Sequence, residues 1–152
     1  TAIEALTCAG VTPAHIAMGI ERARIPARME LLPGDILLDG GHNPQAARAV
    51  RSALEDSGYE RRTAFIGMMN TKDHRVFLQE ILPCFDRVYF CDGFSEGEVP
   101  AEELRRISGL DGAEIFHSPR EALKFARRDR EGGLMYFGGS FYFAAAVREY
   151  LV

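Results

Sequence analysis

The segment 39–44, Asp-Gly-Gly-His-Asn-Pro, combines a carboxylate, an imidazole and an amide within six residues. Its two glycines allow the backbone to turn sharply and to approach a ligand closely. Asn43 before Pro44 is typical of a helix start, where the amino terminus carries about half a positive charge that attracts carboxylates and phosphates. Asp39 could accept hydrogen bonds from hydroxyl groups such as those of a ribose. The alternative is an ordinary strand-to-helix turn in which Asp39 and Asn43 only satisfy backbone N–H groups.

Two other loops carry residues that could bind an acidic ligand. Lys72 offers a flexible positive charge before Asp73, although the pair could equally be an exposed lysine beside a helix-capping aspartate. Gly138-Gly139-Ser140 resembles a phosphate-binding turn, but the chain lacks the complete GxxxxGK[ST] pattern, so this turn cannot be the main triphosphate site. Ser140 could hydrogen-bond a carboxylate or cap the helix that follows.

His42 could carry a proton, donate a hydrogen bond to an acidic substrate or fill the turn. Beside a helix amino terminus the cationic form is disfavoured, so we expect a neutral imidazole. Because no Cys or His partner stands at a usable spacing, we predict no metal site. The remaining histidines, His15, His74 and His117, are expected at the surface. The pattern identifies no catalytic residue.

The composition excludes several classes of protein. The chain has 152 residues, of which 47% are hydrophobic and 26% charged, as in ordinary globular domains. A net charge of −4 argues against a nucleic-acid or anionic-membrane partner. No apolar run approaches the roughly 20 residues of a membrane span. Three scattered cysteines without a CxxC pair predict no disulfide framework and no thiol nucleophile, and they fit a reducing cytoplasm.

Apolar runs alternate with helical patterns along most of the chain, which predicts a mostly parallel sheet with helices on both faces. We expect strands at 29–32, 35–39, 63–67, 87–90, 113–116 and 134–137. Pro33-Gly34 joins the first two strands as a hairpin, so one edge strand is antiparallel. The expected fold is a three-layer, Rossmann-like α/β domain with a six-stranded sheet. In such sheets, ligands bind where the loops after the strands converge.

The helices are expected at 2–6, 12–24, 73–82, 100–107 and 140–151, with two more that begin at Asn43 and Ser118. Thr12, Asn43 and Ser118 each precede a proline at the first helical position and should cap their helices. Residues 1–26 are interpreted as the tail of a preceding domain with a linker helix, and 27–152 as the α/β domain. The chain begins without Met inside a helix, which indicates a piece of a longer protein.

Four motifs, in this order, resemble the carboxy-terminal domain of folylpolyglutamate synthases and bifunctional dihydrofolate synthases of the Mur ligase superfamily. They are Arg28-Met29-Glu30, the segment 39–44, Gly67-Met68 with Lys72-Asp73, and Gly139-Ser140-Phe141. The resemblance covers about residues 12–152. Ala27 and Gly41 stand where the family usually has Gly and Ala, and since both residues are small, the loop shapes should survive.

The resemblance implies an ATP-dependent amide ligase, in which a carboxylate of a pterin-bearing substrate is phosphorylated and the amine of glutamate attacks the acyl phosphate. ATP and magnesium would be bound mainly by a larger amino-terminal domain, so this chain alone should be inactive. By motif, Arg28 would contact the nucleotide phosphates and Asp39 the ribose. The residues implied around the incoming glutamate are His42, Asn43, Lys72 and Ser140.

Two other functions stay open. A cell-wall ligase that adds an amino acid to a nucleotide-linked muropeptide would share the fold and the reaction scheme. A stand-alone module that binds a nucleotide or an amino acid would have no chemistry of its own. All ligase interpretations require that Asp39 and Ser140 lie at the same end of one sheet.

Overall fold

In the computed structural model, six strands form one sheet in the order β1-β2-β6-β3-β4-β5. The structure describes residues 1–23, 25–70, 73–129 and 132–152. The strands are β1 Glu30–Leu32, β2 Ile36–Asp39, β3 Arg62–Ile66, β4 Arg87–Cys91, β5 Ile115–Phe116 and β6 Leu134–Gly138. The edge strand β1 pairs antiparallel with β2, and every other pairing is parallel. The predicted fold class is confirmed.

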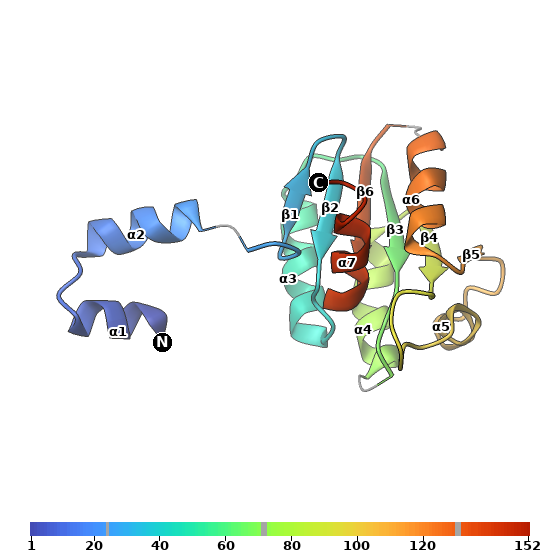
Figure 1. The fold of residues 1–152 in the computed structure, drawn as a ribbon, viewed down its shortest axis with the longest axis horizontal. Helices are drawn as coiled ribbons and strands as arrows, with labels where there is room; N and C mark the ends of the chain where they lie inside the picture. Colours follow the sequence, from blue (N-terminus) through green and yellow to red (C-terminus); the bar gives the residue numbers. More distant parts are fainter. Residues whose placement is uncertain (24, 71–72, 130–131) are drawn as a thin grey trace.

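The helices are α1 Ala2–Cys8, α2 Pro13–Arg22, α3 Pro44–Glu55, α4 His74–Ile81, α5 Ala101–Ser108, α6 Pro119–Arg128 and α7 Phe141–Arg148, with a short 3-10 turn Leu82–Cys84. Helices α3, α4 and α5 supply one of the two buried clusters, whereas α6 and α7 supply the other. The sheet therefore lies between two helical layers (Figure 1).

Alternation along the central strand β3 explains why both faces need helices. Ala64 and Ile66 face the first cluster and Phe65 faces the second, and all three are fully buried. The Phe65 ring stacks on Phe137 of β6 at 4.6 Å and on Tyr89 of β4 at 4.9 Å between ring centroids. Aromatic rings of this size contribute much of the apolar area that stabilises a core without tryptophan.

Side-chain caps start several helices as predicted. Thr12 accepts from the His15 backbone N–H, and Asn43 Oδ1 accepts from the Ala46 N–H at 2.9 Å. The predicted cap at Ser118 is wrong, because among the described residues its side chain makes no capping hydrogen bond. There the fixed φ of the following proline is enough to direct the chain into the helix.

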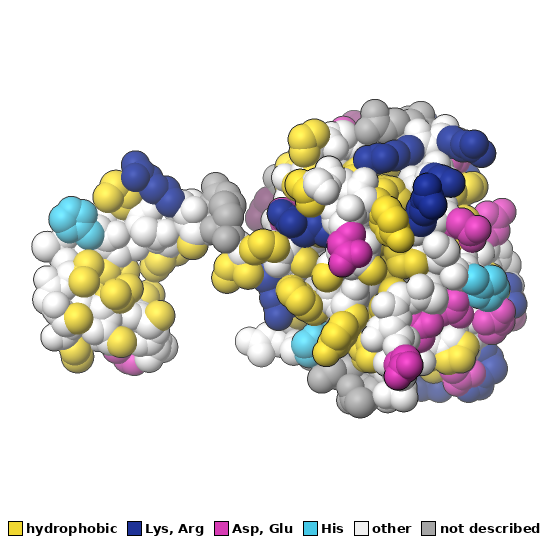
Figure 2. All heavy atoms as spheres, viewed as in Figure 1, with side chains coloured by type: hydrophobic (Ala, Val, Ile, Leu, Met, Phe, Trp, Pro, Cys, Tyr) yellow, Lys and Arg dark blue, Asp and Glu magenta, His cyan; other side chains and the backbone are white. Residues whose placement is uncertain are grey.

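Helices α1 and α2 form a hairpin that stands away from the sheet (Figure 1). Of its described residues only Ile16 is buried. Figure 2 shows hydrophobic side chains on the surface of this hairpin. The large exposed ones are Ile3, Leu6, Met18 and Ile20. No described helix has both the length and the apolar character that crossing a membrane requires.

Candidate functional site

The carboxyl ends of β2, β6 and β3 lie side by side, because these strands are parallel neighbours. Asp39 pairs with Gly138, and Gly138 pairs in turn with Ile66. The Gly67 N–H donates to the Gly138 carbonyl at 3.1 Å, which extends the pairing into the loops. Ser140 follows two residues after Gly138, so Asp39 and Ser140 lie at the same edge of the sheet. The geometric condition for the ligase interpretation is therefore met.

Close backbone approach at this edge requires glycine. A Cβ added at Gly40 would lie 2.8 Å from the Phe141 Cα, so the loop after β2 touches the start of α7. Gly139 has φ +96°, and a Cβ there would lie 3.0 Å from the Gly67 carbonyl oxygen. The loops after β2, β6 and β3 are thus in direct contact, and side chains at these glycines would push them apart.

Asp39 is the acid at the centre of this edge. It is 5% exposed, its Oδ1 accepts from the Gly41 N–H at 2.7 Å, and its Oδ2 accepts from the Met29 N–H at 3.0 Å. A Cβ at Gly41 would lie 2.4 Å from Oδ1, so glycine allows this contact. These bonds agree with the alternative of an ordinary strand-to-helix turn, in which Asp39 satisfies backbone N–H groups. A carboxylate has about four acceptor sites, so further donors can bind, and the ribose contact stays a prediction.

Arg28 lies between two residues with an unusual backbone. Ala27 has φ +53° and Met29 has φ +46°, a left-handed region that costs non-glycine residues about 1–3 kcal/mol each. The Ala27 carbonyl accepts from the Gly40 N–H at 2.7 Å, and Asp39 accepts from Met29, so the loop after β2 holds this strained turn. The Arg28 side chain is exposed and lines a hollow of about 580 Å³.

The side chains predicted for glutamate lie on the same edge with different exposures. His42 is half-buried, and its Nδ1 lies 3.1 Å from the Gly40 carbonyl, to which a protonated Nδ1 donates. Asn43 is exposed and caps α3. Ser140 is 2% exposed, and its Oγ caps α7 through the Tyr142 N–H at 3.2 Å. Lys72 lies outside the described residues.

The other histidines differ in exposure. His15 and His117 are at the surface as predicted, but His74 is half-buried and its Nε2 lies 2.8 Å from the Met69 carbonyl. His74 is thus only partly at the surface, because the Met69 carbonyl contacts its ring. Cys91, at the end of β4, is buried, and burial raises the pKa of its thiol above the usual range, which disfavours a nucleophilic thiolate.

One cluster that the sequence did not reveal surrounds the start of α5. His117 Nδ1 lies 2.9 Å from Asp92 Oδ1, and the neighbouring carboxylates raise the pKa of His117, Asp92 most of all. The other Asp92 oxygen accepts from the Ala101 N–H at 2.8 Å, which caps a helix that Pro100 cannot cap. Donor atoms of Asp92, His117 and Glu102 lie within 4.8 Å of one another and could hold a metal ion, so the absence of a metal site stays a prediction.

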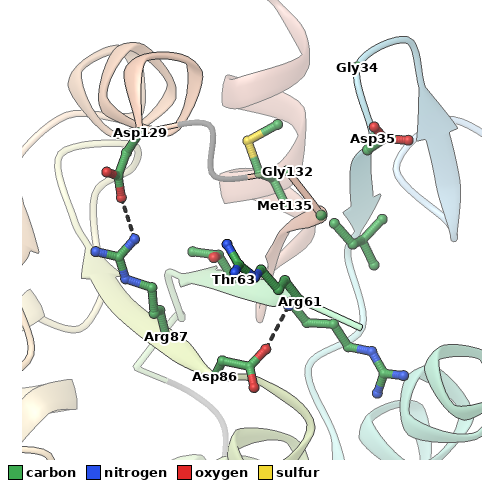
Figure 3. A pocket seen from close by; sticks show the side chains of 12 residues that line it. Gly34, Asp35, Arg61, Thr63, Asp86, Arg87, Asp129, Gly132 and Met135 are labelled. Atoms are coloured by element: carbon green, nitrogen blue, oxygen red, sulfur yellow. Dashed lines mark hydrogen bonds and ion pairs between the residues drawn. The ribbon is translucent and has the colours of Figure 1, made fainter. Parts of the chain in front are cut away.

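A cavity of about 380 Å³ lies at the opposite, amino edge of the sheet, lined by residues before β3, β4 and β6 (Figure 3). Arg87 pairs there with Asp129 at 2.5 Å, and Asp86 accepts from the Arg62 N–H at 2.8 Å. Arg87 and Asp129 thus neutralise each other at the rim of this cavity. Asp35 and Gly133 at this edge also have positive φ. The buried carboxylate of Asp39 and the strained turn around Arg28 lie at the carboxyl edge, which we take as the candidate site.

A doubly wound α/β domain whose loops meet around a buried carboxylate and a helix amino terminus is a Rossmann-like ligand-binding domain. Comparison with known proteins narrows this class. Residues 27–141 match the family model described as Mur ligase, glutamate ligase domain. This chain belongs to that family.

Named relatives agree with this assignment. The folylpolyglutamate synthase of Lacticaseibacillus casei is 28% identical over 150 residues, which are 93% of this chain and 33% of that protein. A probable bifunctional folylpolyglutamate synthase/dihydropteroate synthase of Halobacterium salinarum is 34% identical over 107 residues, 69% of this chain and 13% of that protein. The chain therefore spans a third or less of these relatives.

Solved structures show the same fold. E. coli FolC in complex with DHPP and ADP matches with a TM-score of 0.82 and 26% identity, over 92% of this chain and 34% of that chain. The bifunctional folylpolyglutamate synthase/dihydrofolate synthase of Yersinia pestis, complexed with AMPPNP and a Mn ion, matches with a TM-score of 0.81 and 25% identity, over the same shares of the two chains.

Proposed function

We propose that this chain is the carboxy-terminal domain of an ATP-dependent ligase that adds L-glutamate to dihydropteroate or folate through an acyl phosphate. The meeting of the loops after β2, β6 and β3 at one edge of the sheet carries the proposal. Support comes from relatives that are named as folylpolyglutamate synthases and from solved relatives that hold ADP or AMPPNP.

On the nucleotide side, Arg28 contacts the phosphates and Asp39 the ribose hydroxyls. The exposed Arg28 side chain, set between two residues in left-handed conformation, can reach outward from the edge of the sheet. A guanidinium binds phosphate oxygens through several N–H donors at once. Asp39 already accepts two backbone N–H groups, which orients its remaining lone pairs.

On the glutamate side, His42, Asn43 and Ser140 surround the incoming amino acid together with Lys72. The amino terminus of α3 attracts a carboxylate, and the Ser140 hydroxyl can donate its proton because its oxygen already accepts from Tyr142. Lys72 would add a full positive charge. Domain closure over these groups would exclude water from the acyl phosphate and orient the attacking amine.

We further propose that residues 27–152 work with an amino-terminal ATPase domain of the same polypeptide, which binds most of the ATP and the magnesium ion. Residues 1–26 would link the two parts, consistent with the exposed hydrophobic side chains on α1 and α2. The enzyme would act in the cytoplasm on small molecules, without a nucleic-acid or membrane partner.

The test is ATP-dependent incorporation of labelled glutamate by the longer enzyme that contains this chain, with dihydropteroate and reduced folates as acceptors. We expect incorporation and release of ADP with at least one of them. Incorporation only with a nucleotide-linked muropeptide would assign the cell-wall reaction instead. Binding of nucleotide or glutamate without incorporation would favour the stand-alone module.

The isolated 152-residue chain gives a second test. Without the phosphate-binding loop it should hydrolyse no ATP and bind ADP or glutamate weakly. Calorimetry that shows tight, magnesium-dependent binding of ATP by this chain would contradict the proposal.

A further inference from the structure

Glu30 is the last residue of the Arg28-Met29-Glu30 motif. It is the first residue of β1, and its side chain is 19% exposed. Its carboxylate has two sets of partners: Oε2 accepts from the Ala27 N–H at 2.8 Å, and both oxygens accept from Arg148 Nε, at 3.2 and 3.0 Å. These bonds connect two distant parts of the chain.

The first partner is the strained turn that presents Arg28. Ala27 is 1% exposed and has a left-handed backbone, so its conformation persists only where neighbours hold it. The Glu30 carboxylate accepts from the Ala27 N–H, and the Gly40 N–H donates to the Ala27 carbonyl. The Asp39 carboxylate accepts from the Met29 N–H. Arg28 thus projects from a turn that two carboxylates fix.

The second partner ties this turn to the last helix. Arg148 is the final residue of α7, and Ser140 caps the beginning of the same helix. The ion pair is among the less exposed of those described, with side chains 33% and 19% exposed, and Arg148 lowers the pKa of Glu30. Arg28, Glu30 and Arg148 all line the hollow of about 580 Å³ beside β1.

We propose that Glu30 is a positioning residue for nucleotide binding, which sets the direction of Arg28 through the Ala27 backbone and through α7. This inference rests on the proposed function, in which Arg28 contacts the phosphates. Glu30 itself touches no reacting atom. Its loss should therefore weaken binding of the nucleotide and leave glutamate binding and the chemical step nearly unchanged.

Two variants of the longer enzyme separate the two bonds. Glu30→Gln keeps an oxygen that can accept from the Ala27 N–H but removes the charge that faces Arg148, whereas Glu30→Ala removes both. Glu80→Gln is the matched control, since Glu80 pairs with Arg48 at 2.8 Å between α3 and α4, with side chains 29% and 57% exposed. Steady-state kinetics with varied ATP and varied glutamate, calorimetry with ADP and thermal unfolding are measured for each.

We expect the KM for ATP and the Kd for ADP to rise about tenfold in Glu30→Ala and about threefold in Glu30→Gln, with kcat and the KM for glutamate within about twofold of wild type. Glu80→Gln should change none of these. A merely structural role would lower the melting temperature without this split between the two KM values.

The inference is overturned if both Glu30 variants keep the wild-type KM for ATP, or if the KM for glutamate rises as much as that for ATP. If Glu30→Ala does not fold, Glu30→Gln decides by the same criteria. A wild-type enzyme that ligates no glutamate refutes the proposed function instead. In that case, the ADP affinities of wild type and Glu30→Ala still test the positioning role of Glu30. A wild-type enzyme that binds no ADP refutes both the proposed function and the positioning role.

Discussion

The two edges of the sheet are built differently. The amino edge has a cavity of about 380 Å³ with the ion pair of Arg87 and Asp129 at its surface, and Asp35 there is left-handed. The carboxyl edge has the buried carboxylate of Asp39, which accepts two backbone N–H groups and helps to hold the turn with left-handed residues on both sides of Arg28. An enclosed volume alone does not identify a ligand site. A left-handed backbone occurs at both edges, so the better sign is a buried carboxylate that holds a strained turn, because such strain persists only where surrounding bonds hold it.

The strongest test of this comparison replaces Asp39 with alanine. Two backbone N–H groups, those of Gly41 and Met29, would lose their acceptor. We expect the free energy of unfolding to fall by about 2–3 kcal/mol and ADP binding to weaken. Urea denaturation and calorimetry measure both. Asp39→Asn, which keeps one acceptor, should lose less stability, and a loss below about 0.5 kcal/mol in Asp39→Ala would contradict the comparison.

A smaller effect is expected from Gly40→Ala, which places a methyl group against the backbone of Phe141. We expect a loss of about 1–2 kcal/mol of stability and a clear fall in kcat/KM for glutamate, because the loop after β2 moves away from α7. Gly112→Ala is the control, since a Cβ at this position meets nothing within 4 Å. Equal kinetic losses in the two variants would remove the distinction between the edges.

At the amino edge, Asp129→Asn removes the surface ion pair with Arg87, whose side chains are 32% and 43% exposed. Solvent screens such a pair, so we expect a change of about 0.5 kcal/mol or less in the free energy of unfolding and no change in ligation kinetics. A marked fall in kcat/KM would show that this cavity takes part in function and would weaken the assignment of the carboxyl edge.

The smallest effect concerns His117, which lies beyond β5. Asp92 raises the pKa of His117 in the folded chain above its ordinary value of about 6.5. The stabilisation is therefore fully present below about pH 6.5 and is lost as the pH rises through the folded pKa. Urea midpoints between about pH 5.5 and 8.5 should fall more steeply for wild type than for His117→Gln. Parallel slopes would show that the pair does not contribute.

The order of the strands and helices was readable from the sequence because local signals carried it. Period-two and fully apolar runs marked all six strands, and Asn43-Pro44 marked the start of α3. Pro33-Gly34 predicted the antiparallel edge, which β1 and β2 confirm. Asp39 and Ser140 were found because they stand in glycine-containing loops directly after expected strands, whereas Arg28 was found only through the family resemblance.

Contacts between residues distant in the chain could not be predicted from the sequence. Glu30 and Arg148 stand 118 positions apart, and Asp92 and His117 stand 25 apart, with no periodicity that relates them. The caps showed the same limit. Ser118 has a suitable side chain and a following proline but makes no capping bond, whereas Asp92 caps α5 from the beginning of the loop that leads into this helix. A cap depends on where the side chain points, which the local sequence does not fix.

By itself, the sequence determined the fold class and supplied the candidate residues for binding an anion, because hydrophobic periodicity, turn residues and side-chain chemistry are local properties. The tertiary structure decided the register that sets Asp39 beside Gly138 and Ile66, and it decided the left-handed turn around Arg28. That turn needs acceptors and donors from β1, from the loop after β2 and from α7 at once. No local preference of Ala27 or Met29 would produce it, since both residues avoid positive φ unless other bonds hold them there.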